Sequence, residues 1–240
     1  TVEVAVAGEK AAGGIIITAS HNPAQWNALK LLNSKGEFIS DEDGKKILAI
    51  ADAEQFEFSP VEKVGKYAED KTWMDKHIEM ILKLPLVRKD AIAKANFKVM
   101  VDAVNSTGGI AVPKLLRALG VNEITEMYCT PDGKFPHNPE PLAENLTAIS
   151  AEVKKQNAHL GIVVDPDVDR LAFVCEDGSM FGEEYTLVAV ADYVLKNKNG
   201  NSVSNLSSTR ALRDVTEKHG GNYSGAAVGE VNVVRKIDRK

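Results

Sequence analysis

The chain has 240 residues, of which 44% are apolar and 26% charged, and its formal net charge is −5. This composition is typical of a globular protein with a sizeable core, and it argues against a nucleic-acid-binding or polybasic membrane surface. Cys129 and Cys175 lie far apart, so neither a disulfide framework nor a zinc site of known spacing is expected. No apolar run could span a bilayer and no signal-peptide pattern is present, so we expect a cytoplasmic protein without nucleic-acid or membrane partners.

Apolar runs of strand length alternate with amphipathic stretches along the whole chain. This alternation predicts tandem α/β domains with mixed, largely parallel sheets. Ser40 and Asp43 resemble a helix capping box. In chain order, we first expect a strand at 14–18, a turn at 34–36 between extended segments 27–32 and 37–39, a helix at 40–53, a connecting stretch at 54–72 and a helix at 74–84.

Two further α/β units follow, the first beginning at Phe97 and the second near Gly182. A Pro-, Gly- and Asn-rich loop at 130–141 contains His137, which we expect to be structural. The remaining expected strands are 97–104, 124–129, 160–164, 202–206 and 223–227, and the remaining expected helices are 110–119, 142–156, 183–195 and 210–218.

A run of carboxylates follows the strand expected at 160–164. Asp165, Asp167 and Asp169 are separated by single residues, and Arg170 comes next. In extended backbone, alternate side chains point to the same side, so we expect the three carboxylates to converge. Like charges at such short range repel one another unless a cation is present, and hard oxygen ligands favour magnesium or calcium. The run therefore predicts a metal site, with a solvated acidic turn as the alternative.

A polar loop at 18–23 follows the strand expected at 14–18. Ser20, beside His21 at the end of a strand, is a candidate nucleophile or phosphate carrier. No Gly-x-Ser-x-Gly elbow surrounds it, which disfavours an esterase. The alternative is an ordinary turn in which Ser20 and Asn22 bond the local backbone.

Lys30 lies within the apolar segment 28–32. A lysine among apolar neighbours can have a lowered pKa and take part in proton transfer. The alternative is a lysine that faces outward from a half-exposed strand. The glycine turn at 105–109 lacks the lysine that a phosphate-binding P-loop requires.

The serine loop at 18–23, followed by Asn27 and Lys30, and the aspartate loop at 165–170 together resemble the α-D-phosphohexomutase family. This family includes phosphoglucomutases, phosphomannomutases and phosphoglucosamine mutases. Either motif alone is moderate evidence, whereas both in this order and at this separation are strong evidence. The resemblance covers essentially the whole chain.

The resemblance also implies a division into domains. Residues 1–86 resemble the C-terminal part of domain I, 88–180 resemble domain II, and 181–240 resemble the N-terminal part of domain III. Pro166 and Val168 stand where the family usually has glycine or alanine, although the ligand positions are kept. On this resemblance the chain is truncated at both ends and lacks the sugar-binding loop and domain IV, so we expect the fragment alone to be inactive.

The activity implied by the resemblance is that of an isomerase, an intramolecular phosphotransferase that interconverts hexose 1-phosphate and hexose 6-phosphate. Phosphorylated Ser20 would donate its phosphate, and a sugar bisphosphate would serve as intermediate and activator. One Mg²⁺ would be held by Ser20 and the three aspartates. Arg170 would steady the phosphate, and Lys30 and His21 are the candidates for moving the hydroxyl proton.

The candidate substrate contacts are Asn22, Gly229 and Glu230. The segment 228–232 resembles the glucosamine branch, whereas Ser207 stands where enzymes acting on both glucose and mannose phosphates often have a lysine. We therefore favour glucosamine phosphate, with glucose or mannose phosphate as the other possibilities. Glu230 is alternatively an ordinary acidic residue at a helix N-terminus.

Two other functional hypotheses remain. The spacing of Asp165 and Asp167 after a strand also fits a haloacid-dehalogenase-type phosphatase or mutase with Asp165 as nucleophile. That hypothesis leaves residues 18–30 unexplained. A non-catalytic relative that binds sugar phosphate is the second hypothesis, and the intact Ser20 and aspartates argue against it.

Overall fold

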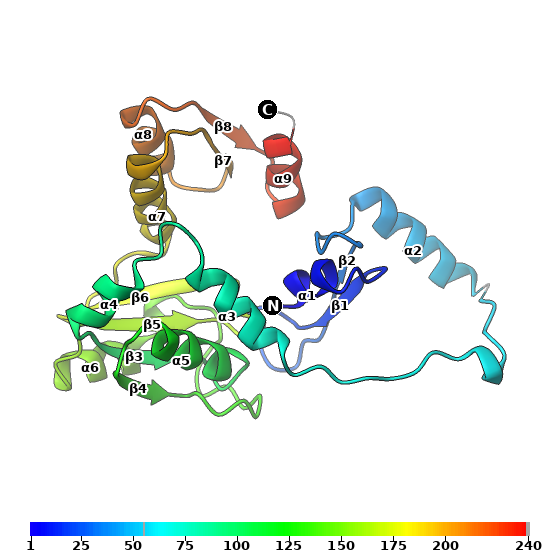
Figure 1. Cartoon of the computed structure of the whole chain (residues 1–240), viewed down its shortest axis with the longest axis horizontal. Coiled ribbons are helices and arrows are strands. Elements are labelled where there is room, and N and C mark those ends of the chain that lie inside the picture. The colour runs from blue at the N-terminus through cyan, green and yellow to red at the C-terminus, as the bar shows by residue number, and fades with distance from the viewer. Residues whose placement is uncertain (55, 239–240) are drawn as a thin grey trace. The chain divides into compact units, whose positions relative to one another are not determined.

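The computed structural model describes residues 1–54 and 56–238 of the chain. These residues form two compact units (Figure 1). The first unit contains residues 1–16 and 29–77, and the second contains residues 17–28 and 78–240. Among the described residues, no helix is both long enough and apolar enough to cross a membrane.

The first unit contains a two-stranded sheet and several helices. Ser40 caps its longest helix, because the Ser40 hydroxyl accepts a hydrogen bond of 3.1 Å from the amide of Asp43, as the sequence predicts. Three acidic residues in the first turn complement the helix dipole. The elements are α1 (Val2–Gly8), β1 (Gly14–Ile17), β2 (Leu29–Leu32), α2 (Asp41–Ala53), the 3-10 helix η1 (Val61–Lys63) and the first part of α3 (Trp73–Leu82).

The turn expected at 34–36 is present. The amide of Gly36 donates to the carbonyl of Asn33 over 3.0 Å, and Gly36 has φ +81°. A side chain at Gly36 would also collide with the carbonyl of Glu3, so glycine is required there. Residues 37–39 are not a strand, however, and contribute only an isolated bridge between Phe38 and Leu32.

A four-stranded sheet organises the second unit (Figure 1). Its strand order is β4-β3-β5-β6, with β3 parallel to both β4 and β5, and β6 antiparallel to β5. The mixed, largely parallel sheet predicted from the sequence is therefore confirmed. The elements are α4 (Lys89–Ala95), β3 (Lys98–Asp102), α5 (Gly108–Ala118), β4 (Glu123–Met127), the 3-10 helix η2 (Ala143–Asn145), α6 (Thr147–Lys155), β5 (Leu160–Val164) and β6 (Leu171–Cys175).

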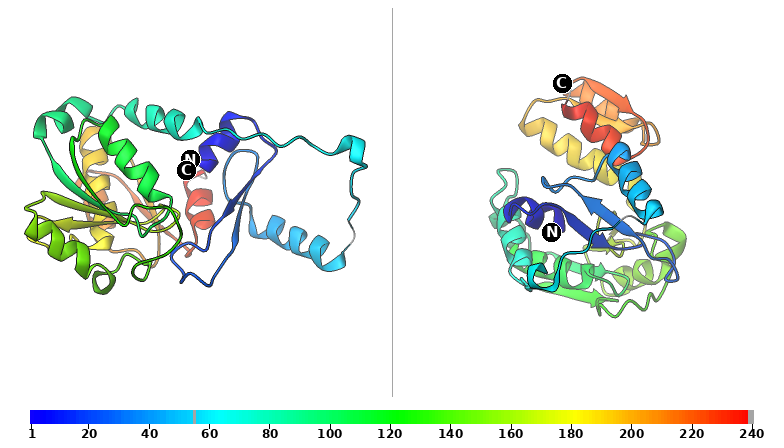
Figure 2. Two further views of the ribbon diagram at one scale, coloured as in Figure 1. Left: turned by 90° about the horizontal axis from the view of Figure 1, so that it is seen from below. Right: turned by 90° about the vertical axis from the view of Figure 1, so that its right-hand side faces the viewer.

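Helices cover both faces of this sheet, which lies between α5 and α6 (Figure 2). Side chains alternate along β3, so Val99 and Val101 pack on the α5 side while Met100 packs on the α6 side. Fully burying a side chain of this kind contributes about 1.5–3 kcal/mol. The buried partners are Leu116 and Val121 on the first face, and Ile149, Val153, Val163 and Val174 on the second.

The C-terminal part of the second unit is a smaller α/β arrangement. Its two strands pair in parallel, and the helices that follow each strand pack against them. The elements are α7 (Glu183–Asn197), β7 (Ser202–Asn205), α8 (Ala211–Lys218), β8 (Tyr223–Ala226) and α9 (Glu230–Asp238).

Several elements differ from the sequence expectation. The helix expected at 142–156 begins only at Thr147, because a 3-10 turn follows Pro141. Strand β6, which pairs antiparallel with β5, was not predicted, although its five residues are an apolar run of strand length. No helix was predicted at α1 or α4, whose seven residues each carry little periodic signal. Helix α9 begins at Glu230, as the alternative interpretation of that residue expects.

Candidate active site

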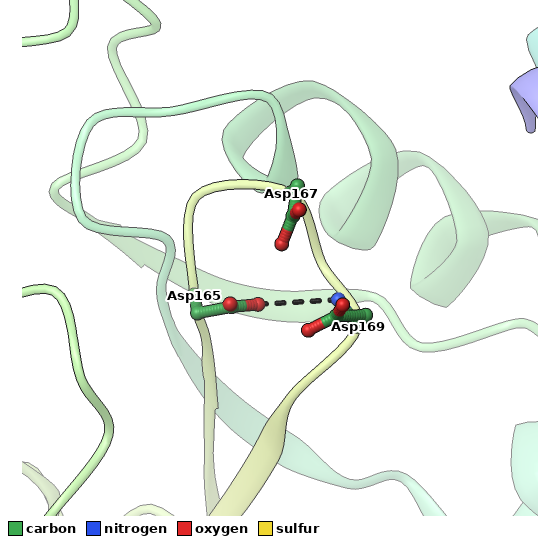
Figure 3. Close-up of side chains that lie close together, drawn as sticks. All are labelled: Asp165, Asp167 and Asp169. Atoms are coloured by element: carbon green, nitrogen blue, oxygen red, sulfur yellow. Dashed lines mark hydrogen bonds between the residues drawn. The ribbon is translucent and has the colours of Figure 1, made fainter. Parts of the chain in front are cut away.

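Three aspartates converge in the loop after β5 (Figure 3). One carboxylate oxygen from each of Asp165, Asp167 and Asp169 lies within 4.8 Å of the others. Asp165 is fully buried, with 0% of its surface exposed, whereas Asp169 is exposed. The convergence predicted from the sequence is therefore present.

The backbone reaches this arrangement by a turn, so the extended conformation predicted for residues 165–169 is wrong. The Asp165 carbonyl accepts a hydrogen bond from the amide of Val168 over 3.1 Å, and Val168 has φ +66°. Oδ1 of Asp165 also accepts bonds of 3.1 Å from the amides of Asp169 and Arg170. The loop therefore folds back around the Asp165 carboxylate and holds a β-branched residue in the left-handed region, a conformation that costs about 1–2 kcal/mol.

The electrostatics of Asp165 fit a hard divalent cation. Among the described residues, its buried Oδ2 atom has no hydrogen-bond partner. Burial raises the pKa of Asp165 to about 7, the amide of Arg170 opposes this shift, and the charges of Asp169 and Asp167 add to it. A buried carboxylate oxygen without a donor, beside two more carboxylates, is a suitable ligand for Mg²⁺. The donor set therefore fits the metal that the resemblance implies.

The serine loop is hydrogen-bonded to the aspartate loop within the second unit. The Thr18 hydroxyl donates to Oδ2 of Asp167 over 3.1 Å and accepts the amide of Ser20 over 2.9 Å. Ser20 itself has φ +54°, an uncommon conformation for a residue other than glycine. The Ala19 carbonyl accepts both the backbone and the side-chain N–H groups of Asn22, at 3.1 and 2.8 Å. Asn22 thus makes the local contacts that the turn alternative expects.

A chain of polar contacts leads away from Ser20. Its Oγ lies 3.2 Å from Nδ1 of His21, and Nε2 of His21 lies 3.3 Å from Nη2 of Arg170. Nη1 of Arg170 donates to Glu140 over 2.9 Å. The structure therefore brings Ser20, His21 and Arg170 together. It adds Glu140, whose place in a proline-rich loop is the only local signal that could have pointed to it.

Two hydroxyl groups just before α5 hold the aspartate loop by hydrogen bonds. Ser106 and Thr107 each donate a hydrogen bond of 2.8 Å to the carbonyl of Pro166. The glycine turn at 105–109 therefore contributes to this site, although it lacks the lysine of a P-loop. Only the tertiary structure assigns these residues to the site.

The remaining candidates are Lys30, Gly229 and Glu230. Lys30 is on β2 in the first unit, where its ammonium group lies 5.8 Å from the centre of the Phe38 ring. Gly229 has φ +113° and precedes α9, and Glu230 is the exposed first residue of that helix. Roles of Lys30 in proton transfer, and of Gly229 and Glu230 in binding sugar, stay predictions.

Known sequences and structures resemble nearly the whole chain. Sequence models of "Phosphoglucomutase/phosphomannomutase, alpha/beta/alpha" domains I, II and III match residues 1–58, 75–178 and 182–240. A "Probable phosphoglucosamine mutase" of Methanopyrus kandleri is 33% identical over 97% of this chain and 50% of its own length. A "Phosphoglucomutase/phosphomannomutase" of Thermococcus kodakarensis is 33% identical over 94% of this chain and 49% of its own length.

A solved structure agrees with these sequences. The putative phosphomannomutase from Thermus thermophilus has a TM-score of 0.81 and 25% identity, covering 95% of this chain and 51% of the other. The chain thus spans about half the length of the relatives it matches. Together with the α/β folds and the serine and aspartate loops, these matches show that the chain belongs to the phosphoglucomutase/phosphomannomutase family, the α-D-phosphohexomutases.

Proposed function

We propose that the protein is a magnesium-dependent phosphohexomutase that interconverts hexose 1-phosphate and hexose 6-phosphate, with Ser20 as the phosphate carrier. The observation that carries this proposal is the Thr18 hydroxyl, which bonds both the amide of Ser20 and the carboxylate of Asp167. The candidate carrier and the candidate metal ligands therefore belong to one hydrogen-bonded cluster. Family membership supports the reaction class.

In the first transfer, the bond between phosphorus and Oγ of Ser20 breaks, and a bond to a sugar hydroxyl oxygen forms. The sugar hydroxyl loses its proton to a base, and Oγ of Ser20 gains one. The resulting bisphosphate then returns its other phosphate to Ser20 by the reverse exchange. A bound Mg²⁺, held by Asp165, Asp167, Asp169 and an oxygen of phosphorylated Ser20, would neutralise charge on the phosphoryl oxygens.

The neighbouring side chains have separate proposed roles. His21, whose Nδ1 lies 3.2 Å from Oγ of Ser20, is proposed to exchange a proton with that atom. Arg170 supplies positive charge beside the phosphate. Lys30 is proposed to move the proton of the sugar hydroxyl. Substrate contacts are proposed for Asn22, Gly229 and Glu230.

Glucosamine phosphate is the sugar we favour, on the segment 228–232, with glucose or mannose phosphate as the alternatives. The names of the relatives cover glucosamine, glucose and mannose, so they do not select among these sugars. Coupled assays of the natural full-length protein on all three sugar phosphates would identify the preferred substrate. We expect the 240-residue chain alone to be inactive in the same assays.

The proposed carrier is tested by peptide mass spectrometry of the natural full-length protein purified from cells. We expect an acid-stable phosphate on Ser20, and loss of both phosphate and mutase activity in Ser20→Ala. A hydroxylamine-sensitive phosphate on Asp165 would instead favour the dehalogenase-type mechanism. If the unmutated protein carries no phosphate and has no mutase activity, the result would favour a non-catalytic binding protein.

A further inference from the structure

We propose that Glu140 is a positioning residue for the chemistry at Ser20, acting through Arg170 and His21. The inference rests on the proposed function, because it concerns the same serine. The carboxylate of Glu140 accepts a hydrogen bond from Arg170 and lies near the ring of His21. Its influence on Ser20 would be passed along a series of hydrogen bonds.

The series fixes the position of one proton. Nη1 of Arg170 donates to Glu140 over 2.9 Å, which turns Nη2 toward Nε2 of His21 at 3.3 Å. A guanidinium group has only donors, so Nε2 of His21 must accept. The proton of the neutral imidazole is then on Nδ1, which lies 3.2 Å from Oγ of Ser20. Glu140 thus selects the tautomer in which His21 donates to Ser20.

The ion pair itself has little value for folding. The side chains of Arg170 and Glu140 are 40% and 34% exposed, and pairs with this much solvent access add little stability. The planar guanidinium nevertheless needs a fixed acceptor to hold its orientation. Glu140 lies 4.0 Å from Nε2 of His21, which is beyond hydrogen-bonding distance, so Arg170 is the link between them.

Glu140 is held in a rigid segment between two prolines. Its amide donates to Oδ1 of Asn138 over 3.1 Å, and its carbonyl accepts from Asn145 over 2.8 Å. His137 anchors the same loop, since its Nε2 lies 3.1 Å from the buried carboxylate of Asp102 at the end of β3. The expectation that His137 is structural agrees with this contact. The loop that holds Glu140 is therefore attached to the C-terminal end of β3.

The test compares Glu140→Ala and Glu140→Gln with the unmutated full-length protein. Glu144→Ala is the matched control, because Glu144 is an exposed glutamate in the adjoining 3-10 helix. We expect Glu140→Ala to lower kcat about ten- to a hundredfold, as misplacement of catalytic groups does, with little change in the KM for hexose 1-phosphate. Glu140→Gln should recover part of the loss because its amide oxygen can accept from Arg170. The control should retain full activity.

Nitrogen NMR of the His21 ring gives a readout that a purely structural role would not move. We expect the Nδ1–H tautomer in the unmutated protein and a mixture of the two tautomers in Glu140→Ala. An unchanged tautomer, or a lowered melting temperature with unchanged kcat, would overturn the proposal. If the unmutated protein carries no phosphate on Ser20, the proposed function fails, and the tautomer comparison still decides the role of Glu140.

Discussion

Thr18 and Asp167 are 149 residues apart in the sequence, yet the hydroxyl of one donates a 3.1 Å hydrogen bond to the carboxylate of the other. The same hydroxyl accepts the amide of Ser20. One threonine therefore orients a proposed metal ligand and fixes the backbone of the proposed phosphate carrier. This double role makes Thr18 a direct test of whether the serine loop and the aspartate loop work together.

Thr18→Val keeps the shape of the side chain and removes its hydroxyl. We expect the affinity for Mg²⁺ to fall by about tenfold or more, as it does when an outer partner of a metal ligand is lost. Isothermal titration calorimetry measures this affinity. Thr18→Ser retains the hydroxyl and should bind Mg²⁺ almost as well as the unmutated protein. Equal affinities for the valine and serine variants would show that the hydrogen bond to Asp167 has no such role.

The raised pKa of Asp165 predicts how the metal-free protein responds to pH. Its carboxyl has a pKa of about 7 when folded and 3.8 as the ordinary value, so between these values the folded state holds the extra proton. The contribution of Asp165 to stability should therefore be greatest below this window and fall as pH rises toward 7, by at most about 1.4 kcal/mol for each step of one pH unit. Thermal melts in a chelator, from acidic to neutral pH, measure the decline.

The pH-dependent contribution of His137 must be separated from that of Asp165 in that experiment. Burial lowers its pKa, but the hydrogen bonds to Asp102 and Asn138 outweigh burial and raise it overall, so its contribution also declines as pH rises. Asp165→Asn removes only the first titration, and the difference between the two melting profiles isolates Asp165. Added Mg²⁺ should raise the melting temperature most above pH 7, where protons no longer compete for the site. Parallel profiles for both proteins would contradict the assignment.

The left-handed conformation of Val168 predicts that a glycine variant is more stable than an alanine variant at this position, which is the reverse of the usual order. Within regular structure, a variant with glycine is usually less stable than the same protein with alanine by about 0.5–1 kcal/mol. At φ +66°, however, alanine keeps the Cβ strain that glycine relieves. We expect Val168→Gly to be more stable than Val168→Ala, as measured by urea denaturation. The usual order, with alanine more stable, would mean that this residue does not occupy the left-handed region.

Gly109 allows α5 to approach the end of β4. A methyl group there would collide with the carbonyl of Cys129, so we expect Gly109→Ala to destabilise the second unit by about 1–3 kcal/mol, as overpacking does. It should also weaken Mg²⁺ binding, because the start of α5 holds the carbonyl of Pro166. The control is Gly44→Ala in α2, where the nearest atom is 3.9 Å away. That change should stabilise its helix by about 0.5–1 kcal/mol.

The sequence by itself determined the features that depend on local interactions. A continuous apolar run of strand length predicted β5, and hydroxyl and carboxyl groups three residues apart predicted the cap of α2 at Ser40. The single-residue spacing of Asp165, Asp167 and Asp169 predicted that their carboxylates converge after a strand, although it predicted the wrong backbone conformation for them. These signals lie within a few residues of one another, so they can be read without knowledge of the fold.

Only the tertiary structure decided how these pieces meet. The turn at Val168 depends on amides that bond the Asp165 carboxylate, and the antiparallel direction of β6 depends on its pairing with β5. The contacts from Thr18 to Asp167 and from Glu140 to Arg170 join distant segments. Such contacts leave no periodicity or local spacing in the sequence, because packing of the sheet and its loops brings the partners together.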